Sequence, residues 1–549
     1  MSNNVASLPE DFRGLHIHFV GIKGTGMAAL VEILFHKGAV ITGSDVSERF
    51  YTDEVLERLG LKALPFGAEN ITDDVQYVIY SSAYKLDKNP DLIEAVKRGV
   101  PCLLYTQALG AYSERAYSCG VCGVHGKTST TGLVGTILKE IDLPSQVLAG
   151  SVINSFGGTC TYTSPMVADE KRHVELVSAS MNGSRPLRST AARRLAQNAP
   201  LEHFDGLQPS LPKFGMTSVF VAETCEYQRH FMSFCPQKII LTSVEPDHED
   251  YYPTYEDIRQ AFIDYICKLP EGGEVIYCAD DKGACDTIGL VHEKRPDIVT
   301  LPYGEKAGAD YAVTFGKVEN ERNSFTLGHF AGKGDFALAM PGRHEVLDAA
   351  AAVALVCQML REFGKEPLDY YENIRRGLLN FSGGKRRSEI VGRFTNKNGA
   401  DVIVLDDYGH HPTAVKTTLE GYREFYKGRK IIVDFMSHTY SRTQALLPEF
   451  AKCFTAADEV ILHKIYSSVR ENPADFVITG RTLYEAVLAT GQKDVHYYEE
   501  ILDATDFAKA ELEKPLGPEY PDGYLFITMG AGDNWKLGKE ILKDYEESK

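Results

Sequence analysis

A glycine-rich hexapeptide, Gly123–Thr128, most constrains how this chain can fold, because it joins two segments of different periodicity. The apolar run Tyr117–Val124 leads into it, and the helical pattern Ser129–Glu140 follows it. A strand that passes through glycines into a helix directs backbone N–H groups and the positive end of the helix dipole at one point, which suits phosphate. Lys127 can then reach the outer phosphates, and the Thr128 hydroxyl is placed to ligate Mg²⁺.

A full Walker A pattern would also require glycine at position 121, where this chain has Val121. The loop is therefore interpreted as a shortened phosphate cradle. Its predicted nucleotide contacts are Gly123, Val124, His125, Gly126, Lys127, Thr128 and Ser129.

The length and charge of the chain narrow its class. At 549 residues it is too long for one core, and a length prior suggests about three or four domains. The net charge of −18 argues against a nucleic-acid partner, which would require basic surface. No apolar stretch approaches the roughly 18–20 residues of a membrane span, and Met1–Glu10 lacks the features of a signal peptide. We therefore expect a cytoplasmic protein.

The eleven cysteines lie mostly within apolar runs, which is typical of reduced, buried thiols rather than a disulfide framework. The closest pair, Cys119 and Cys122, has the spacing of a redox or metal motif. It stands without a second such pair or clustered histidines, so packing within a strand is the preferred interpretation.

Three segments show alternating strand and helix patterns, which predict an α/β protein with three Rossmann-like or related units. The expected domains are 1–114, 115–382 and 383–549. An irregular stretch rich in Ser, Arg, Asn and Pro interrupts the second unit at about 169–213, and we expect a surface excursion there.

The first unit contains its own glycine loop, Gly21–Ala29, after a strand and before a helix. It fits G-x-G-x-x-A, and Asp45 follows at the end of the second strand, as in dinucleotide-binding folds. Alone, this layout favours NAD. Because any nucleotide diphosphate satisfies the same physics, it defines the kind of site and not the ligand.

Acidic residues and a histidine follow two strands beyond the phosphate loop. Glu223 ends one apolar strand, and Glu245 and His248 follow the next. Ligands of parallel sheets gather beyond the carboxyl ends of strands, so Glu223 is expected to share a Mg²⁺ with Thr128. His248 is a plausible second metal ligand, since imidazole and carboxylate both tolerate divalent cations that bridge phosphates.

In the third unit, Asp406–Pro412 again lies between a strand and a helix. Its two acids and two histidines could bind zinc, but adjacent residues point apart and make a poor tetrahedral cage. A ribose contact from Asp407 and an orienting turn are preferred. The basic run Lys385–Arg387 is expected either to cap phosphates at the domain joint or to be solvated.

Together these segments resemble the Mur ligase family of ATP-dependent amino-acid ligases that build peptidoglycan precursors. The resemblance spans nearly the whole chain in order, except near 169–213. The residues that carry it are Gly21–Met27, Gly123–Thr131, Glu223 with Glu226, Glu245–Asp250, Pro341–His344, Ala349–Ala352, Asp406–Pro412, His438 with Arg442–Thr443, and Gly530–Gly532.

The resemblance implies a UDP-binding domain, a central ATPase domain and a C-terminal domain that binds the incoming amino acid. It is closest to the members that join L-alanine to the lactyl carboxylate of UDP-N-acetylmuramate through an acyl phosphate. The implied cofactors are ATP and Mg²⁺. The implied roles are UDP-sugar binding by Gly24, Thr25, Gly26, Met27, Asp45 and Ser81; nucleotide binding by the phosphate loop, Arg387 and Asp407; catalysis by Lys127, Glu223 and His248; metal binding by Thr128, Glu223 and His248; and amino-acid or acyl-phosphate contacts by His411, His438 and Arg442.

Some positions depart from the family pattern. Glu345 and Asp348 stand where two asparagines usually lie near the adenine, and a carboxylate accepts hydrogen bonds but does not donate them. Ser243 stands where Asn is common, and Thr439 where Arg often follows the histidine. The first change bears on nucleotide affinity, and the last on how the acyl phosphate or the amino-acid carboxylate is held.

Three alternative functions remain open besides the ligation of L-alanine. One is the recycling ligase that joins UDP-N-acetylmuramate to a tripeptide, which has the same fold and a similar loop. Another is an NAD-dependent dehydrogenase built on Gly24–Asp45, which leaves the second phosphate loop unexplained. The third is a non-catalytic nucleotide-binding regulator, against which Lys127 argues. A monomer or weak homodimer is expected.

Overall fold

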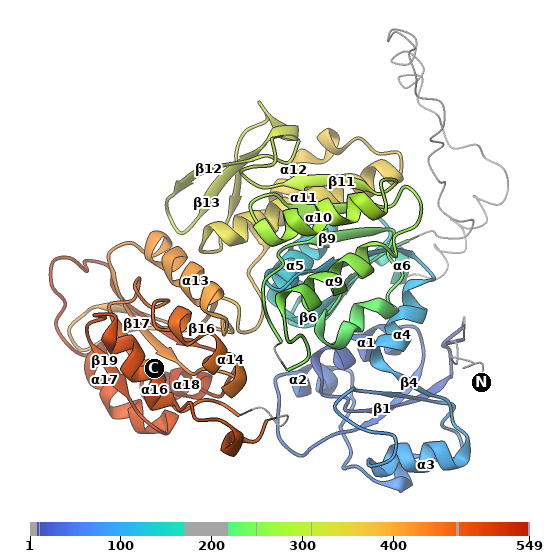
Figure 1. The fold of residues 1–549 in the computed structure, drawn as a ribbon, viewed down its shortest axis with the longest axis horizontal. Coiled ribbons are helices and arrows are strands. Elements are labelled where there is room, and N and C mark those ends of the chain that lie inside the picture. The colour runs from blue at the N-terminus through green and yellow to red at the C-terminus, as the bar shows by residue number, and fades with distance from the viewer. Residues whose placement is uncertain are drawn as a thin grey trace.

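The computed structural model of the protein describes residues 8–9, 11–168, 218–248, 250–308, 310–467 and 471–546. The irregular stretch predicted at 169–213 lies outside the described residues. Figure 1 shows the chain passing from a blue N-terminal unit through a green and yellow central unit to an orange and red C-terminal unit. Each unit is built on a sheet of predominantly parallel strands, so the predicted α/β class is confirmed.

The N-terminal sheet has the order β2-β1-β3-β4, and all its strands are parallel. Its elements are β1 (His16–Val20), α1 (Thr25–His36), β2 (Val40–Ser44), α2 (Thr52–Arg58), β3 (Tyr77–Tyr80), α3 (Pro90–Arg98), β4 (Cys102–Leu104) and α4 (Tyr105–Ser113). Helix α1 is apolar on most of its surface because it also packs against β6 and β7 of the central unit, so the two units share one hydrophobic core.

The central sheet has seven strands in the order β11-β10-β9-β5-β8-β6-β7, of which only the β6–β7 pairing is antiparallel. The strands are β5 (Tyr117–Cys122), β6 (Ser145–Ile153), β7 (Thr159–Thr163), β8 (Val219–Glu223), β9 (Lys238–Leu241), β10 (Glu274–Cys278) and β11 (Val299–Tyr303). Later strands flank β5 on both sides. The loop that follows β5 therefore lies at a switch point, where α/β sheets bind ligands.

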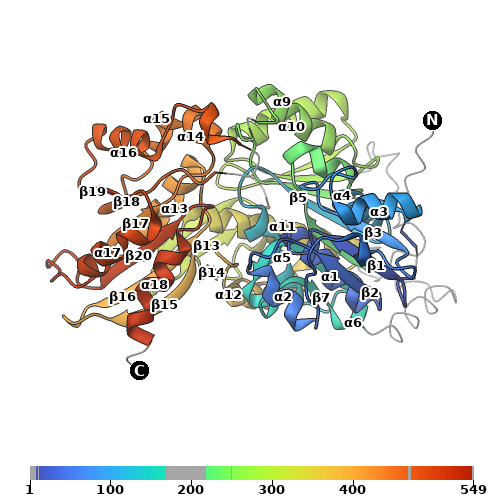
Figure 2. The same ribbon diagram turned by 90° about the horizontal axis from the view of Figure 1, so that it is seen from below.

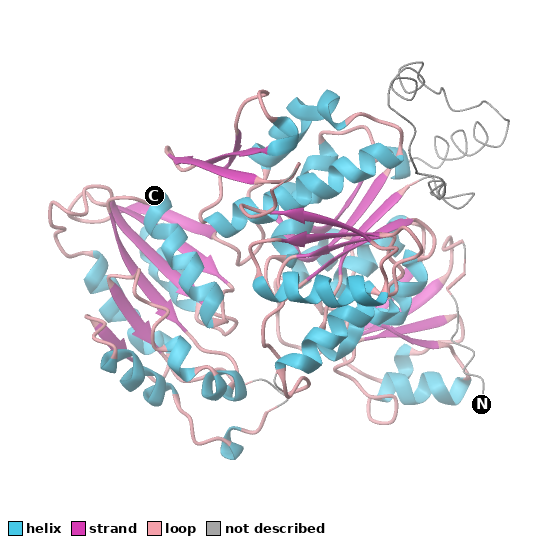
Figure 3. Cartoon of the chain, turned by 45° about the horizontal axis from the view of Figure 1, so that its top comes forward, coloured by secondary structure: helices cyan, strands magenta, loops and turns pink. Residues whose placement is uncertain are grey.

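The helices of the central unit cover this sheet, as the cyan and magenta layers of Figure 3 show. They are α5 (Lys127–Lys139), α6 (Pro165–Ala168), α9 (Tyr255–Ile266), α10 (Lys282–Lys294), α11 (Arg343–Glu362) and α12 (Tyr371–Asn380). Helix α11 is buried along most of its length against α5, because a run of alanines lets the two helices approach closely. A small antiparallel sheet that the sequence did not predict adjoins it, formed by β12 (Val313–Val318), β13 (Asn323–Leu327) and β14 (Phe336–Leu338).

The C-terminal sheet has the order β15-β16-β20-β17-β18-β19, parallel except for β15 (Figure 2). Its strands are β15 (Glu389–Thr395), β16 (Asp401–Asp407), β17 (Arg429–Phe435), β18 (Glu459–Leu462), β19 (Val495–Tyr497) and β20 (Gly523–Met529). Its helices are α13 (Pro412–Phe425), α14 (Tyr440–Ala445), α15 (Leu447–Phe450), α16 (Gly480–Ala489), α17 (Thr505–Leu512) and α18 (Trp535–Glu546).

All eleven cysteines are free thiols, in line with the expectation from the sequence. Cys119 and Cys122 are buried within β5, where they serve strand packing. In the part of the chain that the structure describes, no helix combines the length and apolar character that crossing a membrane demands.

Candidate active site

The phosphate loop links the end of β5 to the start of α5, and two glycines make its shape possible. Gly123 and Gly126 have φ angles of +133° and +78°, which residues with a Cβ rarely adopt. A Cβ on Gly126 would also collide with the Asp348 carboxylate. Ser243, the second residue after β9, holds the loop. Its hydroxyl accepts the His125 N–H at 3.0 Å, and its carbonyl accepts the Val124 N–H at 3.1 Å.

Lys127 lies at the first position of α5, and its ammonium group faces a buried acid. It is 3.0 Å from the Glu226 carboxylate and also donates to the Gly123 and Val124 carbonyls. Burial opposes the charge on Lys127, but the Glu226 carboxylate outweighs it and the pKa of Lys127 is raised. The lysine is therefore held cationic beside the loop.

Thr128 and Glu223 meet as the sequence predicted. The Thr128 hydroxyl donates to Glu223 at 2.9 Å, and the same carboxylate oxygen accepts the Gly150 N–H at 2.7 Å. Hydroxyl and carboxylate oxygens at the ends of adjacent elements are the donor set that Mg²⁺ prefers, so these residues fit the ion that the sequence implies.

His248 lies beside Glu226 instead of Glu223. Its Nε2 is 3.4 Å from the Glu226 carboxylate, and its backbone has a φ of +58°, in the left-handed region. Burial disfavours the imidazolium, yet Glu226 and Asp247 together raise the pKa of His248. Sequence reasoning gave Glu226 no role, although this acid contacts both Lys127 and His248. Its position three residues beyond Glu223 was the available signal.

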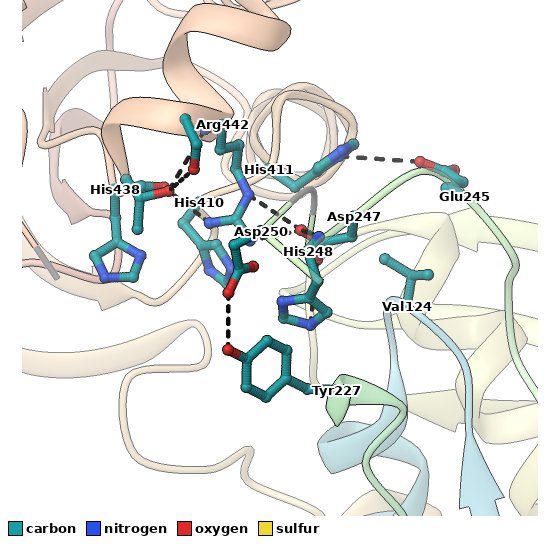
Figure 4. A network of polar contacts seen from close by, with 12 residues as sticks. Val124, Tyr227, Glu245, Asp247, His248, Asp250, His410, His411, His438 and Arg442 are labelled. Atoms are coloured by element: carbon teal, nitrogen blue, oxygen red, sulfur yellow. Dashed lines mark hydrogen bonds and ion pairs between the residues drawn. The ribbon is translucent and has the colours of Figure 1, made fainter. Parts of the chain in front are cut away.

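An ion pair joins the central and C-terminal units across this site (Figure 4). The Arg442 guanidinium, from α14, contacts one Asp247 oxygen at 2.6 and 3.2 Å, and both side chains are 6% exposed. Arg442 also donates to the His438 carbonyl at 2.8 Å. Burial alone would raise the pKa of Asp247, but the Arg442 charge holds it far below its usual range.

The two adjacent histidines before α13 point in different directions, as the sequence suggested. His410 bonds the Tyr408 carbonyl at 2.9 Å, and its ring centroid is 6.2 Å from that of His438. His411 instead faces the phosphate loop, with its ring centroid 5.0 Å from that of His125. Burial lowers the pKa of His411 to about 4.

Asp407 is the last residue of β16 and contacts the turn that was predicted to follow this strand. Its carboxylate accepts the Gly409 N–H at 2.7 Å and the Ser388 N–H at 2.8 Å, so it fixes the backbone locally. Both arginines of the basic run flank the Tyr408 ring, with guanidinium carbons 5.3 Å (Arg386) and 5.6 Å (Arg387) from its centre. Arg386 also pairs with Asp406 at 2.8 Å.

Behind the phosphate loop lie the two acids that depart from the family pattern. The Ser129 hydroxyl donates to Glu345 at 3.0 Å, and both residues are buried. Burial raises the pKa of Glu345 to about 7 and that of Asp348 well above its usual range. A protonated carboxyl group both donates and accepts, so the restriction that applies to a carboxylate is relaxed in the protonated form.

The first glycine loop and the central unit enclose a cavity of about 290 Å³. From the N-terminal unit it is lined by Gly24, Thr25, Gly26, Met27, Ser81 and Tyr105, and from the central unit by Glu223, Thr224, Cys225, His230 and Phe231, among others. Asp45 is absent from its lining. That carboxylate instead accepts from the Lys23 N–H at 2.7 Å, the Val46 N–H at 2.8 Å and the Tyr84 hydroxyl at 3.0 Å.

The fold and the site define a three-unit α/β enzyme with a glycine-rich loop between β5 and α5 and a second glycine loop beside a cavity that reaches Glu223. Family models match as "Mur ligase family, catalytic domain" at residues 16–117, "Mur ligase middle domain" at 205–356 and "Mur ligase, glutamate ligase domain" at 386–532. The chain belongs to the Mur ligase family.

Relatives of the chain support this family assignment over nearly its whole length. It is 42% identical to the UDP-N-acetylmuramate–L-alanine ligase of Treponema pallidum, covering 98% of this chain and 99% of that protein. It is 33% identical to the protein of that name in Borreliella burgdorferi, over 96% and 98%. Among solved structures, the alanine ligase of Thermotoga maritima superposes with a TM-score of 0.68 at 22% identity, covering 97% and 100%, and shows the same fold.

Proposed function

We propose that this protein joins L-alanine to the lactyl carboxylate of UDP-N-acetylmuramate with hydrolysis of ATP, in peptidoglycan precursor synthesis. The names of its relatives at 42% and 33% identity supply the substrates. The observation that carries the proposal is the cavity that runs from the first glycine loop to Glu223. A sugar nucleotide held by the first loop would extend its carboxylate through this cavity toward the phosphate loop.

The proposed reaction has two steps. A lactyl carboxylate oxygen attacks the γ-phosphorus of ATP, and the bond to the β–γ bridging oxygen breaks to release ADP and leave an acyl phosphate. The neutral amine of L-alanine then adds to the acyl carbon, and inorganic phosphate leaves as the amine loses a proton. Such transfers depend mainly on alignment and on stabilising charge at the phosphoryl oxygens.

The residues of this chain divide these tasks in the proposal. Lys127, held cationic by Glu226, would neutralise charge on the transferred phosphoryl group. Gly123–Ser129 would bind the phosphates, and Arg387 and Asp407 the rest of the nucleotide. His411, His438 and Arg442 would serve the amino-acid and acyl-phosphate side.

Mg²⁺ would be held by Thr128 and Glu223, with His248 at a second position after it exchanges its contact with Glu226 for the ion. When bound, the ion would supply charge neutralisation at the phosphates. On the UDP-sugar side, the proposed contacts are Gly24, Thr25, Gly26, Met27 and Ser81. Asp45 would hold the backbone of the first glycine loop in place, whether or not it also contacts a ribose.

The remaining proposals concern organisation. We retain 1–114, 115–382 and 383–549 as the domain limits, a cytoplasmic location and a monomer or weak homodimer. Support for the limits comes from the last helix of the first unit, which ends at Ser113, and from the first strand of the third, which begins at Glu389.

Phosphate release from ATP, measured with UDP-N-acetylmuramate and a panel of amino acids, tests the function. We expect release that depends on both the sugar nucleotide and L-alanine, with a product heavier by one alanyl residue in mass spectrometry. Release that required the free tripeptide instead of L-alanine would contradict the proposal and favour the recycling ligase. Size-exclusion chromatography with light scattering tests the oligomeric state.

A further inference from the structure

Two histidines and a glutamate from three separate segments converge where the C-terminal unit meets the phosphate loop. His125 lies within the loop, Glu245 follows β9, and His411 precedes α13. One ligand atom of each lies within 4.8 Å of the others. Figure 4 shows His411 and Glu245 facing each other across the gap between the units.

We propose that His125, Glu245 and His411 form a binding site for a Zn²⁺-class ion, distinct from the Mg²⁺ position at Thr128 and Glu223. The site would connect the phosphate loop directly to the C-terminal unit. It requires no substrate, so it stands or falls independently of the ligase reaction.

The distances support a site that forms when the two histidines move toward each other. The His125 Nε2 is 3.5 Å and the His411 Nδ1 3.9 Å from the same Glu245 oxygen. Ligand atoms around a tetrahedral zinc, with bonds of about 2.0–2.1 Å, lie roughly 3.4 Å apart. The two contacts with Glu245 are near this separation, whereas the three ligand atoms lie within 4.8 Å of one another, so rotamer changes at the histidines would bring the third pair closer.

The hydrogen bonding of these side chains leaves their nitrogens available. The His125 Nε2 is buried and has no hydrogen-bond partner among the described residues. The His411 Nδ1 accepts the Thr413 N–H at a long 3.4 Å, which an ion would replace at small cost. Thr413 also donates its hydroxyl to Glu245 at 3.2 Å and so orients the carboxylate, as residues around metal ligands commonly do.

The donor types select the class of ion. Two imidazole nitrogens and one carboxylate suit zinc and its neighbours in the transition series, whereas Mg²⁺ prefers oxygen ligands throughout. Three protein ligands also leave one position open, the arrangement of zinc sites that accept water or another ligand.

Cobalt provides a spectroscopic test, because Co²⁺ absorbs visible light when imidazoles bind it in a tetrahedral site. The full-length protein is stripped with a chelator, supplied with excess Mg²⁺ to fill oxygen sites, and titrated with Co²⁺ alone. We expect one Co²⁺ per chain with visible absorption bands, and displacement of that ion by Zn²⁺. The absence of a stoichiometric Co²⁺ signal in the wild-type protein would overturn the proposal.

Variants locate the ion. We expect His125→Ala and His411→Ser to weaken Co²⁺ binding more than roughly 100-fold, and Glu245→Gln to weaken it at least about tenfold. Serine at 411 retains an oxygen that can cap α13. Glu245→Gln preserves side-chain volume, so it decides the question if a histidine variant fails to fold by circular dichroism.

Two matched controls complete the test. His410→Ala removes the neighbouring histidine, which faces His438, and should leave Co²⁺ binding unchanged. His248→Ala removes the imidazole beside Glu226 and should also leave it unchanged. If His248→Ala abolishes the Co²⁺ bands while the variants at His125, Glu245 and His411 retain them, the ion belongs to the other position and the proposal is wrong.

Discussion

The chain contains two glycine loops that look alike in sequence, each between a strand and a helix, but their surroundings differ. The first, around Gly24 and Gly26, faces a cavity with aromatic walls, and its acid, Asp45, bonds the backbone of the loop itself. The second, Gly123–Thr128, is surrounded by ionisable groups: Glu226 and Glu245 of its own unit and His411 of the C-terminal unit. Similar glycine motifs thus lead into helices in different ways, since Gly24 before α1 has a φ of −57° and Gly126 before α5 a φ of +78°, and the surrounding side chains differ as well.

The largest expected effect comes from removing the cation of the second loop. Lys127→Ala should lower the rate of phosphoryl transfer more than roughly 10³-fold, because no other ammonium group bonds Glu226 among the described residues. Binding of UDP-N-acetylmuramate, measured calorimetrically, should remain nearly unchanged.

The lysine of the first loop is the matched control for that experiment. The Lys23 ammonium lies 3.1 Å from the Asp53 carboxylate, so this lysine forms a structural ion pair within its own unit. Lys23→Ala should reduce turnover far less than Lys127→Ala. If Lys23→Ala and Lys127→Ala reduced turnover equally, the two loop lysines would not differ in their part in phosphoryl transfer.

The next largest effect is expected from the ion pair between Asp247 and Arg442, which joins the central unit to the C-terminal unit. Arg442→Met leaves the Asp247 carboxylate buried without its partner, which costs about 3–5 kcal/mol. We expect kcat/KM to fall by roughly 100-fold, with part of the loss recovered in the double variant Arg442→Met/Asp247→Asn.

A double-mutant cycle measured by steady-state kinetics and by urea unfolding checks this interaction. Arg423→Met, which breaks a more exposed pair with Asp458 in the same unit, is the control and should have a small effect. Strict additivity of the Arg442 and Asp247 variants would mean that the pair does not couple the two units.

A smaller effect is expected at the first loop. In Gly26→Ala the new Cβ would lie 2.7 Å from the Tyr105 ring, so the ring must shift within the cavity. The KM for UDP-N-acetylmuramate should rise roughly tenfold while the KM for ATP stays constant. Gly289→Ala on α10, where a Cβ meets nothing within 4 Å, should change neither constant. If only the KM for ATP rose, the first loop would serve ATP, and its assignment to UDP-N-acetylmuramate would be wrong.

The sequence predicted those features that local chemistry determines. The bounds of helix α3 follow from local signals in the sequence, because Asn89 caps its start, Pro90 occupies its first turn and Gly99 adopts the left-handed conformation after its end. The contact of Thr128 with Glu223 was predictable because parallel strands end at one edge of a sheet.

Contacts between distant segments could not be predicted in the same way. The bridge that Glu226 makes between Lys127 and His248 depends on a turn after β8, which no periodicity encodes. The proximity of His125 and His411 depends on how the C-terminal unit sits against the central one. The β12–β14 sheet was missed because its strands, of 6, 5 and 3 residues, are too short for alternation to stand out in the sequence.

The last effect concerns stability and leaves turnover aside, and it tests the buried acids behind the second loop. Glu345 has a folded pKa of about 7 against an ordinary value of 4.5, so the folded chain keeps a proton that the unfolded chain releases between these pH values. Stability should therefore fall by about 1.4 kcal/mol per pH unit for this proton as pH rises from 4.5 to 7, and then level off. Glu345→Gln removes this dependence, so it should unfold at a higher temperature than the wild type at pH 8 and at a similar one at pH 4.5. Glu57→Gln, at an exposed acid whose pKa is lowered by Arg49, should show no such gain. An unfolding temperature for Glu345→Gln that tracks the wild type at every pH would mean that Glu345 is ionised behind the loop.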